Sequence, residues 1–258
     1  MNLFNTVIQY SCSVGILRKG TVCDLPQSSV SLSIICPPQN TQVGTAIWNN
    51  ESEFLELVRQ VLEKTAFITK PGGICCLVLS YEFEDGSERL IPMPVRVLKS
   101  IHMGLNKSPW SLIDELIWVK GTKEKKIIKP DEAEMVANFK DIPFSQIFVL
   151  EKKEPTVERA TRQEVASNMP ESNAVKDEMS DVIWYVQPSS ENVLHGSIHN
   201  EIVRRLELIY SKEGDLVFEP FSVDGVVGTV SKTLKRNFAC LAVGKDEAKR
   251  LKNILSAP

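Results

Sequence analysis

Long apolar runs are the first feature that this 258-residue sequence lacks. The longest covers residues 74–79, whereas a helix that crosses a bilayer needs roughly 20 apolar residues. The first residues also lack the basic and apolar regions of a secretory signal. We therefore expect no membrane partner and a cytoplasmic location, or a nuclear one if the source is eukaryotic.

Patterns typical of disulfide frameworks and zinc sites are also missing. No two of the six cysteines have the CxxC spacing, and Cys75 and Cys76 lie in the apolar run, where thiols act as small hydrophobic groups. His195 and His199 are four residues apart, without a glutamate at metalloprotease spacing. We expect reduced cysteines, structural or surface histidines and no metal site.

An excess of charge of one sign is the third absence. The chain has 30 Lys and Arg against 33 Asp and Glu, which argues against a uniformly basic, nucleic-acid-coating surface. One local lysine run is typical of a contact with a phosphate backbone. Glu124 interrupts it, so a solvated loop is the competing interpretation. The proposed DNA-binding residues are Lys120, Lys123, Lys125 and Lys126.

What is present is an alternation of strand and helix patterns. At 43% hydrophobic and 24% charged residues, the composition is that of a globular protein and excludes collagen-like, disulfide-scaffold and wholly disordered chains. The alternation predicts a parallel α/β sheet. We expect a turn at residues 70–73 and a flexible insertion or linker at 151–181. The predicted strands are 30–35, 74–80, 112–119, 147–150, 182–186, 216–218 and 238–243, and the predicted helices are 51–67, 94–103, 199–210, 225–234 and 246–255.

Residues 213–243 give the strongest local signal. A strand, a glycine-containing turn with an acidic residue, a helix and a second strand form one βαβ unit of a nucleotide-binding fold. The turn places backbone amides and a helix N-terminus where a cofactor binds in such folds. This unit alone predicts a Rossmann-like fold and no particular ligand.

Four segments together resemble the amino-group DNA methyltransferases. Residues 219–222, Glu-Pro-Phe-Ser, are similar to the start of that family's cofactor motif, (D)-P-F-x-G-x-G-T. Residues 31–40 include Cys-Pro-Pro-Gln, which resembles the catalytic (D/N/S)-P-P-(Y/F/W). Residues 70–73 match a K-P-G-G turn, and residues 115–120 resemble an I-I-W-x-K strand. A catalytic motif that precedes the cofactor motif is the permuted order of the β-type subgroup.

The resemblance implies a fold, an activity and partners. The expected fold is a single circularly permuted, Rossmann-like S-adenosylmethionine-dependent methyltransferase domain over residues 1–258, with a mostly parallel sheet and helices on both faces. Residues 121–181 would form a variable insertion and a target-recognition region. The implied activity is methylation of DNA at N4 of cytosine or N6 of adenine, as in restriction–modification. The subgroup commonly self-associates, which implies a homodimer or a heterodimer with a related subunit.

The resemblance also assigns site residues. In the family, the first catalytic residue and the following proline carbonyl accept hydrogen bonds from the amine, and the fourth residue stacks on the flipped base. These positions are Cys36, Pro37, Pro38 and Gln39 here. The implied S-adenosylmethionine-binding residues are Glu219, Pro220, Phe221, Ser222, Asp224 and Gly225.

Departures from the family pattern leave three hypotheses open. The Cys36 thiol is a weak acceptor, and Gln39 lacks a ring, whose stacking typically contributes about 1–3 kcal/mol. Val223 replaces a glycine, and Ala242 stands where the family commonly has an acidic residue for the ribose. The leading hypothesis is an active DNA methyltransferase. The alternatives are an inactive DNA-binding or regulatory relative, and an enzyme that methylates RNA or another amine.

Overall fold

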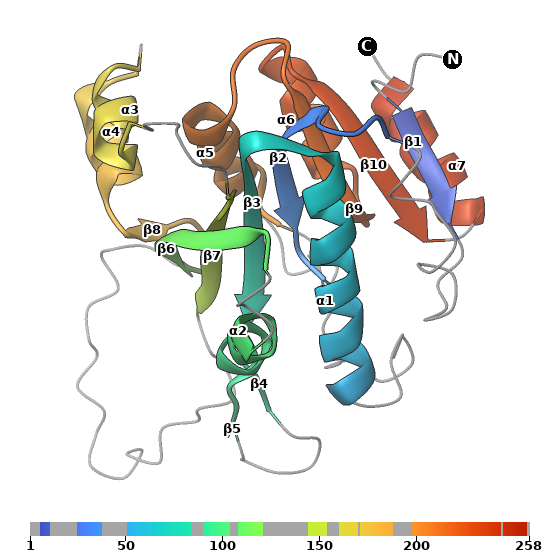
Figure 1. Ribbon diagram of the computed structural model, residues 1–258. Helices are drawn as coiled ribbons and strands as arrows, with labels where there is room; N and C mark the ends of the chain where they lie inside the picture. Colours follow the sequence, from blue (N-terminus) through green and yellow to red (C-terminus); the bar gives the residue numbers. More distant parts are fainter. Residues whose placement is uncertain are drawn as a thin grey trace, which may run out of the picture.

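An eight-stranded sheet with helices on both faces frames the protein, as the computed structural model shows (Figure 1). The structure describes residues 6–10, 25–37, 51–83, 90–103, 108–120, 144–153, 160–169, 171–187, 198–243 and 245–256. The sheet strands are β1 (Thr6–Tyr10), β2 (Val30–Ile35), β3 (Thr69–Ser80), β6 (Trp110–Val119), β7 (Phe144–Lys152), β8 (Ile183–Tyr185), β9 (Leu216–Ser222) and β10 (Asn237–Val243). A separate antiparallel pair joins β4 (Glu82–Phe83) and β5 (Leu90–Ile91). The helices are α1 (Glu51–Ile68), α2 (Met93–Met103), α3 (Arg162–Ser167), α4 (Asn173–Ser180), α5 (Asn200–Tyr210), α6 (Val226–Thr233) and α7 (Lys245–Ser256).

The sheet is mostly parallel, as predicted. Its strand order is β1-β10-β9-β2-β3-β7-β6-β8. Of these eight strands, β7 alone runs antiparallel to its neighbours β3 and β6. The carboxyl ends of the other seven strands therefore lie at the same edge of the sheet.

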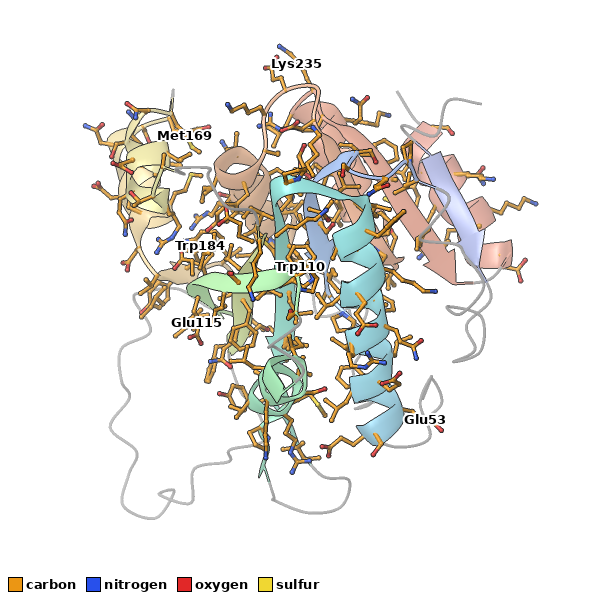
Figure 2. All side chains as sticks on the ribbon, in the orientation of Figure 1. Glu53, Trp110, Glu115, Met169, Trp184 and Lys235 are labelled. Carbon is orange, nitrogen blue, oxygen red and sulfur yellow. The ribbon has the colours of Figure 1, made fainter. Side chains whose placement is uncertain are left out.

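The period-2 alternation of β3 divides the core into two layers. Its odd-numbered residues from Cys75 to Leu79 pack in the cluster that holds the buried side chains of α1 and α2. Its even-numbered residues from Ile74 to Val78 belong to the cluster formed with α5 and α6. A third cluster joins α7 to β10. Figure 2 shows the outcome, with Trp184 inside the packed side chains and Glu53 and Lys235 at the periphery.

The Lys-Pro-Gly-Gly segment forms a bulge inside β3, so the predicted turn is wrong. Between two pairings with β2, the register advances by five residues on β3 but by two on β2. Gly72 has φ +65°, a conformation that favours glycine. A Cβ on Gly73 would lie 2.9 Å from the Lys70 carbonyl oxygen. Lys70 Nζ donates to Ser31 Oγ (2.8 Å) and Asp215 Oδ1 (3.1 Å), which ties the bulge to β2 and to the start of β9.

The helices α3 and α4 occupy part of the segment predicted as a flexible linker, and this prediction is wrong for them. Figure 1 shows the two helices side by side, next to α5 and beyond the end of the sheet. Thr161 and Glu164 form a capping box at the start of α3. Ala166 and Met179 are fully buried in the cluster that α5 shares.

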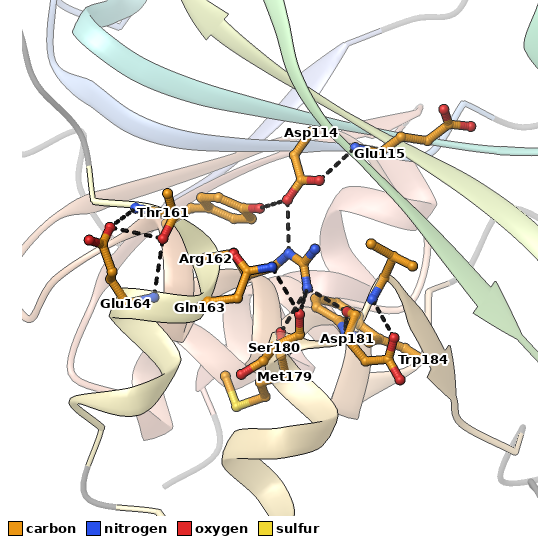
Figure 3. A network of polar contacts seen from close by, with 12 residues as sticks. Asp114, Glu115, Thr161, Arg162, Gln163, Glu164, Met179, Ser180, Asp181 and Trp184 are labelled. Atoms are coloured by element: carbon orange, nitrogen blue, oxygen red, sulfur yellow. Dashed lines mark hydrogen bonds and ion pairs between the residues drawn. The ribbon is translucent and has the colours of Figure 1, made fainter.

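A buried guanidinium attaches these helices to the sheet (Figure 3). Arg162, whose side chain is 3% exposed, donates from Nε to Asp114 Oδ2 of β6 at 2.8 Å. Its Nη1 donates to the backbone carbonyls of residues 179–181 at the end of α4. The Tyr210 hydroxyl of α5 donates to the same Asp114 oxygen at 3.4 Å. One arginine therefore joins α3 and the end of α4 to Asp114 of β6, which lies 48 residues earlier in the chain.

His199 has a structural role, in line with the expectation. It is the N-cap of α5, and its Nδ1 accepts a hydrogen bond from the Glu201 backbone N–H at 3.1 Å. Burial lowers the pKa of His199, which favours the neutral imidazole that can accept this bond. His195 lies outside the described residues.

Candidate active site

The two predicted motifs meet where the sheet reverses its strand order. The strands β9 and β2 are parallel neighbours, with Leu32 opposite Val217. From β9 the chain continues through α6 to β10 on one side, and from β2 it continues through α1 to β3 on the other. Such a switch point opens a crevice at the carboxyl ends of the strands, where α/β proteins bind ligands. Cys36 directly follows β2 and Asp224 closely follows β9 at this edge.

Glu219 is a buried carboxyl group in β9. Its residue is 5% exposed, and burial and the neighbouring Asp224 raise the pKa of Glu219 to about 7. The Ser222 hydroxyl and the Cys240 thiol oppose this rise. Within the described part of the chain, Glu219 Oε2 has no hydrogen-bond partner. Such an atom fits a ligand that brings its own donor.

The remaining residues of the predicted cofactor motif are buried or shape the turn after β9. Phe221 is 3% exposed and packs in the cluster of α1, while Pro220 and Ser222 are also buried. Gly225 has φ +75° and caps α6, and a Cβ there would lie 3.2 Å from Leu251 Cδ2 of α7. Gly225 is therefore required by the turn and by helix packing.

The turn has polar supports as well. Asp224 Oδ1 accepts a hydrogen bond from the Val226 N–H at 3.2 Å, which fixes its carboxylate at the start of α6. Arg250 of α7 donates to the Val223 carbonyl. Val223, which replaces a glycine of the family motif, is half-buried here. The turn is thus held from both sides by α6 and α7.

Cys36 is a neutral thiol that directly follows β2 at the carboxyl edge of the sheet. The pKa of Cys36 is raised to about 12, mainly by burial; Lys120 opposes the rise, and the nearby carboxylates of Glu219 and Asp224 add to it. These effects place the two motifs within electrostatic range of each other. A thiol with this pKa is a poor nucleophile at neutral pH. Pro37 beside it is buried, and Pro38 and Gln39 lie outside the described residues.

Lys120 lies at the same carboxyl edge of the sheet as Cys36, and its predicted role in DNA binding stays a prediction. It follows β6 and is half-buried, with Nζ 5.4 Å from the centre of the Trp118 ring. Trp118 Nε1 donates to the Val186 carbonyl at 2.9 Å, which fixes the ring. Burial lowers the pKa of Lys120, and the Cys36 thiolate would raise it. Lys123, Lys125 and Lys126 lie outside the described residues.

Sequence patterns missed a second buried carboxyl group near Glu219. Glu207 of α5 is fully buried and accepts a hydrogen bond from Ser231 Oγ at 2.7 Å. Burial raises the pKa of Glu207 to about 8, Ser231 and Arg236 oppose the rise, and Glu219 adds to it. A signal existed, because Glu207 stands four residues after Val203 and so lies on the apolar stripe of its helix.

The described residues fit part of S-adenosylmethionine. The cofactor carries an ammonium group, which suits the unpaired Oε2 of Glu219. The turn at Gly225 leads into the N-terminus of α6, where backbone N–H groups can face a ligand. Ala242 is fully buried at the end of β10 and supplies no charged group for the ribose hydroxyls. The amino-acid end of the cofactor is therefore better matched than its ribose.

The strand order, the switch point and the two motifs at its edge define a Rossmann-like methyltransferase. The chain belongs to the DNA methylase family, which matches residues 30–254. This membership confirms the resemblance on which the sequence analysis relied. No curated protein matches the sequence.

Solved structures share the fold across almost the whole chain. A putative DNA modification methylase from Thermus thermophilus, TTHA0409, has a TM-score of 0.71 at 17% identity and covers 97% of this chain and 94% of that chain. The cytosine-N4-specific PvuII DNA methyltransferase has a TM-score of 0.69 at 15% identity, with 98% and 87% covered. The M1.HpyAVI–SAM complex has a TM-score of 0.57 at 16% identity, with 98% and 100% covered. The predicted fold class is confirmed.

The described residues contain neither a membrane-spanning helix nor a cluster of metal ligands. None of the helices there has the length and apolar character needed to cross a membrane. In the same part of the chain, no three His, Cys, Asp or Glu side chains gather closely enough to hold a metal ion.

Proposed function

We propose that this protein transfers a methyl group from S-adenosylmethionine to an exocyclic amine of DNA, at N4 of cytosine or N6 of adenine. The observation that carries the proposal is the meeting of the two family motifs at the switch point. Cys36 of the catalytic motif lies within electrostatic range of Glu219 and Asp224 of the cofactor motif. A DNA methylase needs this adjacency, because methyl donor and acceptor must be held in contact.

The residues of the cofactor motif have separate roles in this proposal. Glu219 accepts a hydrogen bond from the ammonium group of S-adenosylmethionine, and Gly225 allows the turn that brings the start of α6 to the ligand. Phe221 packs the strand beneath it. When bound, the cofactor supplies an electrophilic methyl group on a sulfonium.

The catalytic motif positions the amine. An exocyclic amine is a poor nucleophile because its lone pair is delocalised into the ring, so its hydrogens must be held by acceptors while the base is flipped out. The neutral thiol of Cys36 is a weak acceptor. The Pro37 carbonyl therefore carries most of this task in our proposal, with Pro38 and Gln39 completing the motif.

DNA is the substrate that the family implies. Lys123, Lys125 and Lys126 remain the sequence-based candidates for phosphate contacts, and residues 121–181 remain the candidate recognition region. Pairing with a second copy or with a related subunit also stays a prediction.

Binding and transfer test the proposal separately. Calorimetry should detect heat with S-adenosylmethionine and with S-adenosylhomocysteine, and incubation with labelled cofactor should place methyl groups on DNA. The absence of heat with both ligands would contradict the cofactor assignment. Label on RNA with none on DNA would favour the alternative substrate.

An inactive relative is the second candidate, favoured by the neutral Cys36 thiol and the uncharged Ala242. The double substitution of Cys36→Ser with Gln39→Tyr tests the catalytic motif separately from the cofactor motif. A gain of transfer would locate the deficit in the catalytic motif, and cofactor binding without any gain would locate it elsewhere. Methylated bases produced by the unmodified protein would eliminate this candidate.

A further inference from the structure

A row of polar side chains crosses four neighbouring strands at the carboxyl edge of the sheet. Its middle members are Ser80 at the end of β3 and Ser145 in β7, which are paired residues with hydroxyl oxygens 2.7 Å apart. Each is two residues from an apolar side chain, Val78 or Ile147, of the cluster shared with α5. The period of two therefore places both hydroxyls on the face that α5 covers.

The ends of this polar row are Cys36 and Lys120. Cys36 packs against the same α5 cluster. Lys120 stands two residues after Trp118, a member of that cluster which pairs with Ser145 in the sheet. The ammonium lies over the Trp118 ring rather than out in solvent. Lys120 is thus held against the face and edge of the sheet on which Cys36 lies.

The position of the polar row assigns it to the methyl acceptor. The cofactor motif lies on β9 and at the start of α6, on one side of β2. We call this region, together with α5, β10 and α7, the cofactor side. The polar row extends to the other side, over β3, β7 and β6. This region with β8, α3 and α4 is called the acceptor side. A base whose amine lies at Cys36 and Pro37 would extend over the row. This step rests on the proposed function.

We propose that Lys120 is a substrate-binding residue that selects cytosine. Its ammonium donates hydrogen bonds to the ring of the flipped base whose amine lies at Cys36 and Pro37. Cytosine presents two adjacent acceptors next to its amine, N3 and O2, whereas adenine presents N1 followed by a carbon-bound hydrogen. A lysine has three donors and no acceptor, so it can serve both acceptors of cytosine.

The surroundings of Lys120 support this role. Within the described part of the chain, its ammonium forms no hydrogen bond or ion pair, and its contact is with the Trp118 ring. The Val186 carbonyl fixes the indole, and the Lys120 ammonium lies over its ring. Donors that are partly desolvated and positioned in advance favour a ligand that brings matching acceptors. Cytosine supplies these next to the reacting amine.

The test measures how much the base contributes to the affinity for a DNA strand, and it does not depend on enzymatic activity. Fluorescence anisotropy compares a short oligodeoxycytidine, an oligodeoxyadenosine and an abasic strand of equal length, each with S-adenosylhomocysteine present. We expect the unmodified protein to bind oligodeoxycytidine at least about tenfold more tightly than the other two. Lys120→Met should weaken oligodeoxycytidine binding by roughly 10- to 100-fold and leave the abasic strand almost unchanged. Lys120→Arg, which retains donors, should recover part of the loss.

A matched control is Lys70→Met, which removes a half-exposed lysine in the β3 bulge, where Lys70 contacts Ser31 and Asp215. It should leave the preference for cytosine intact. Unfolding midpoints establish that each variant folds, and Lys120→Leu, which also lacks a donor, carries the same test if Lys120→Met does not fold.

Three results would overturn the inference. Equal loss on the oligodeoxycytidine and abasic strands, with a shallower salt dependence, would show that Lys120 contacts phosphate. Equal affinity of the unmodified protein for cytosine and adenine strands would remove the selection, and an unchanged Lys120→Met would remove the contact. Failure of the proposed function is distinguishable, because it appears as absent methyl transfer while the base preference and its dependence on Lys120 persist.

Discussion

The cofactor side and the acceptor side differ in how their buried charged groups are paired. On the acceptor side, Arg162 and Asp114 satisfy each other and close the network of Figure 3. On the cofactor side, Glu207 and Glu219 each keep one carboxylate oxygen without a partner in the described part of the chain. Buried polar groups are costly when unpaired. The difference indicates that the charged groups buried on the acceptor side pair with each other, whereas those on the cofactor side are stabilised by protons and, as we propose, by a ligand.

Removing Arg162 should have the largest effect, because it breaks the network that Arg162 forms with Asp114. Arg162→Ala leaves Asp114 and several backbone carbonyls without their partner, and loss of one member of a buried ion pair costs about 3–5 kcal/mol. Chemical denaturation should show this decrease in the free energy of unfolding. Arg59→Ala is the control, since it removes exposed ion pairs worth at most about 1 kcal/mol. Equal effects of the two substitutions would contradict the comparison.

Gly228→Ala tests how tightly α7 closes the cofactor side. A Cβ at this position would lie 2.7 Å from Leu255 Cδ2 and 3.2 Å from Phe238 Cδ2. We expect a loss of about 1–3 kcal/mol, as for other overpacked cores, although alanine is the better helix former. Thermal unfolding measures it. Thr229→Ala at the exposed position next to it should be nearly neutral, and a stabilised Gly228→Ala would show that α7 packs loosely.

Glu207→Gln sharpens the comparison through pH. The folded pKa of Glu207, raised to about 8, lies above its unfolded value, so the folded state keeps a proton that the unfolded chain releases. Its contribution to stability therefore falls as pH rises from about 4.5 to 8 and is constant above that range. Glutamine keeps an acceptor for Ser231 without this titration. Relative to the unmodified protein, the variant should gain about 1–3 kcal/mol between pH 6 and pH 8. Denaturation curves that shift in parallel at both pH values would refute this.

The smallest expected effect concerns Glu219 and the cofactor. Because the pKa of Glu219 is raised to about 7, its carboxylate is mostly protonated at pH 6 and mostly ionised at pH 8. An ammonium ligand prefers the ionised form, so affinity for S-adenosylhomocysteine should increase roughly tenfold over this interval. Calorimetry at both pH values measures it. In Glu219→Gln the increase should disappear, and a persistent increase would assign the titration to another group.

The sequence predicted the frame of the molecule better than its site. Long patterns such as residues 51–67 and 246–255 predicted helices within a few residues, because burial of one face decides the structure. The short helices α3 and α4 were not predicted, because one arginine attaches them to the sheet. Composition does not reveal a contact between two residues that are 48 positions apart. The signal that did exist was the capping box at Thr161 and Glu164.

The sequence proposes site residues where a family motif names them, and it is silent where only the three-dimensional arrangement brings residues together. Cys36 and Glu219 were found through the family resemblance, and the structure brings them together. Lys120 belongs both to the segment that resembles the I-I-W-x-K strand and to the lysine run, and the alternation of β6 puts it on the same face as Trp118. Ser80 and Ser145 carry no motif at all, because only the antiparallel pairing of β3 and β7 makes them neighbours.

The strand order also governs how this chain reaches its native state. The late strands β9 and β10 lie between β1 and β2, which are the first two strands of the chain. The sheet between β1 and β2 therefore cannot be completed until the segment after residue 215 has left the ribosome. Pairings of such high contact order make folding slow. Until then β2 presents an open edge, so a truncated or stalled chain is expected to expose the edge that forms the active crevice and to aggregate through it.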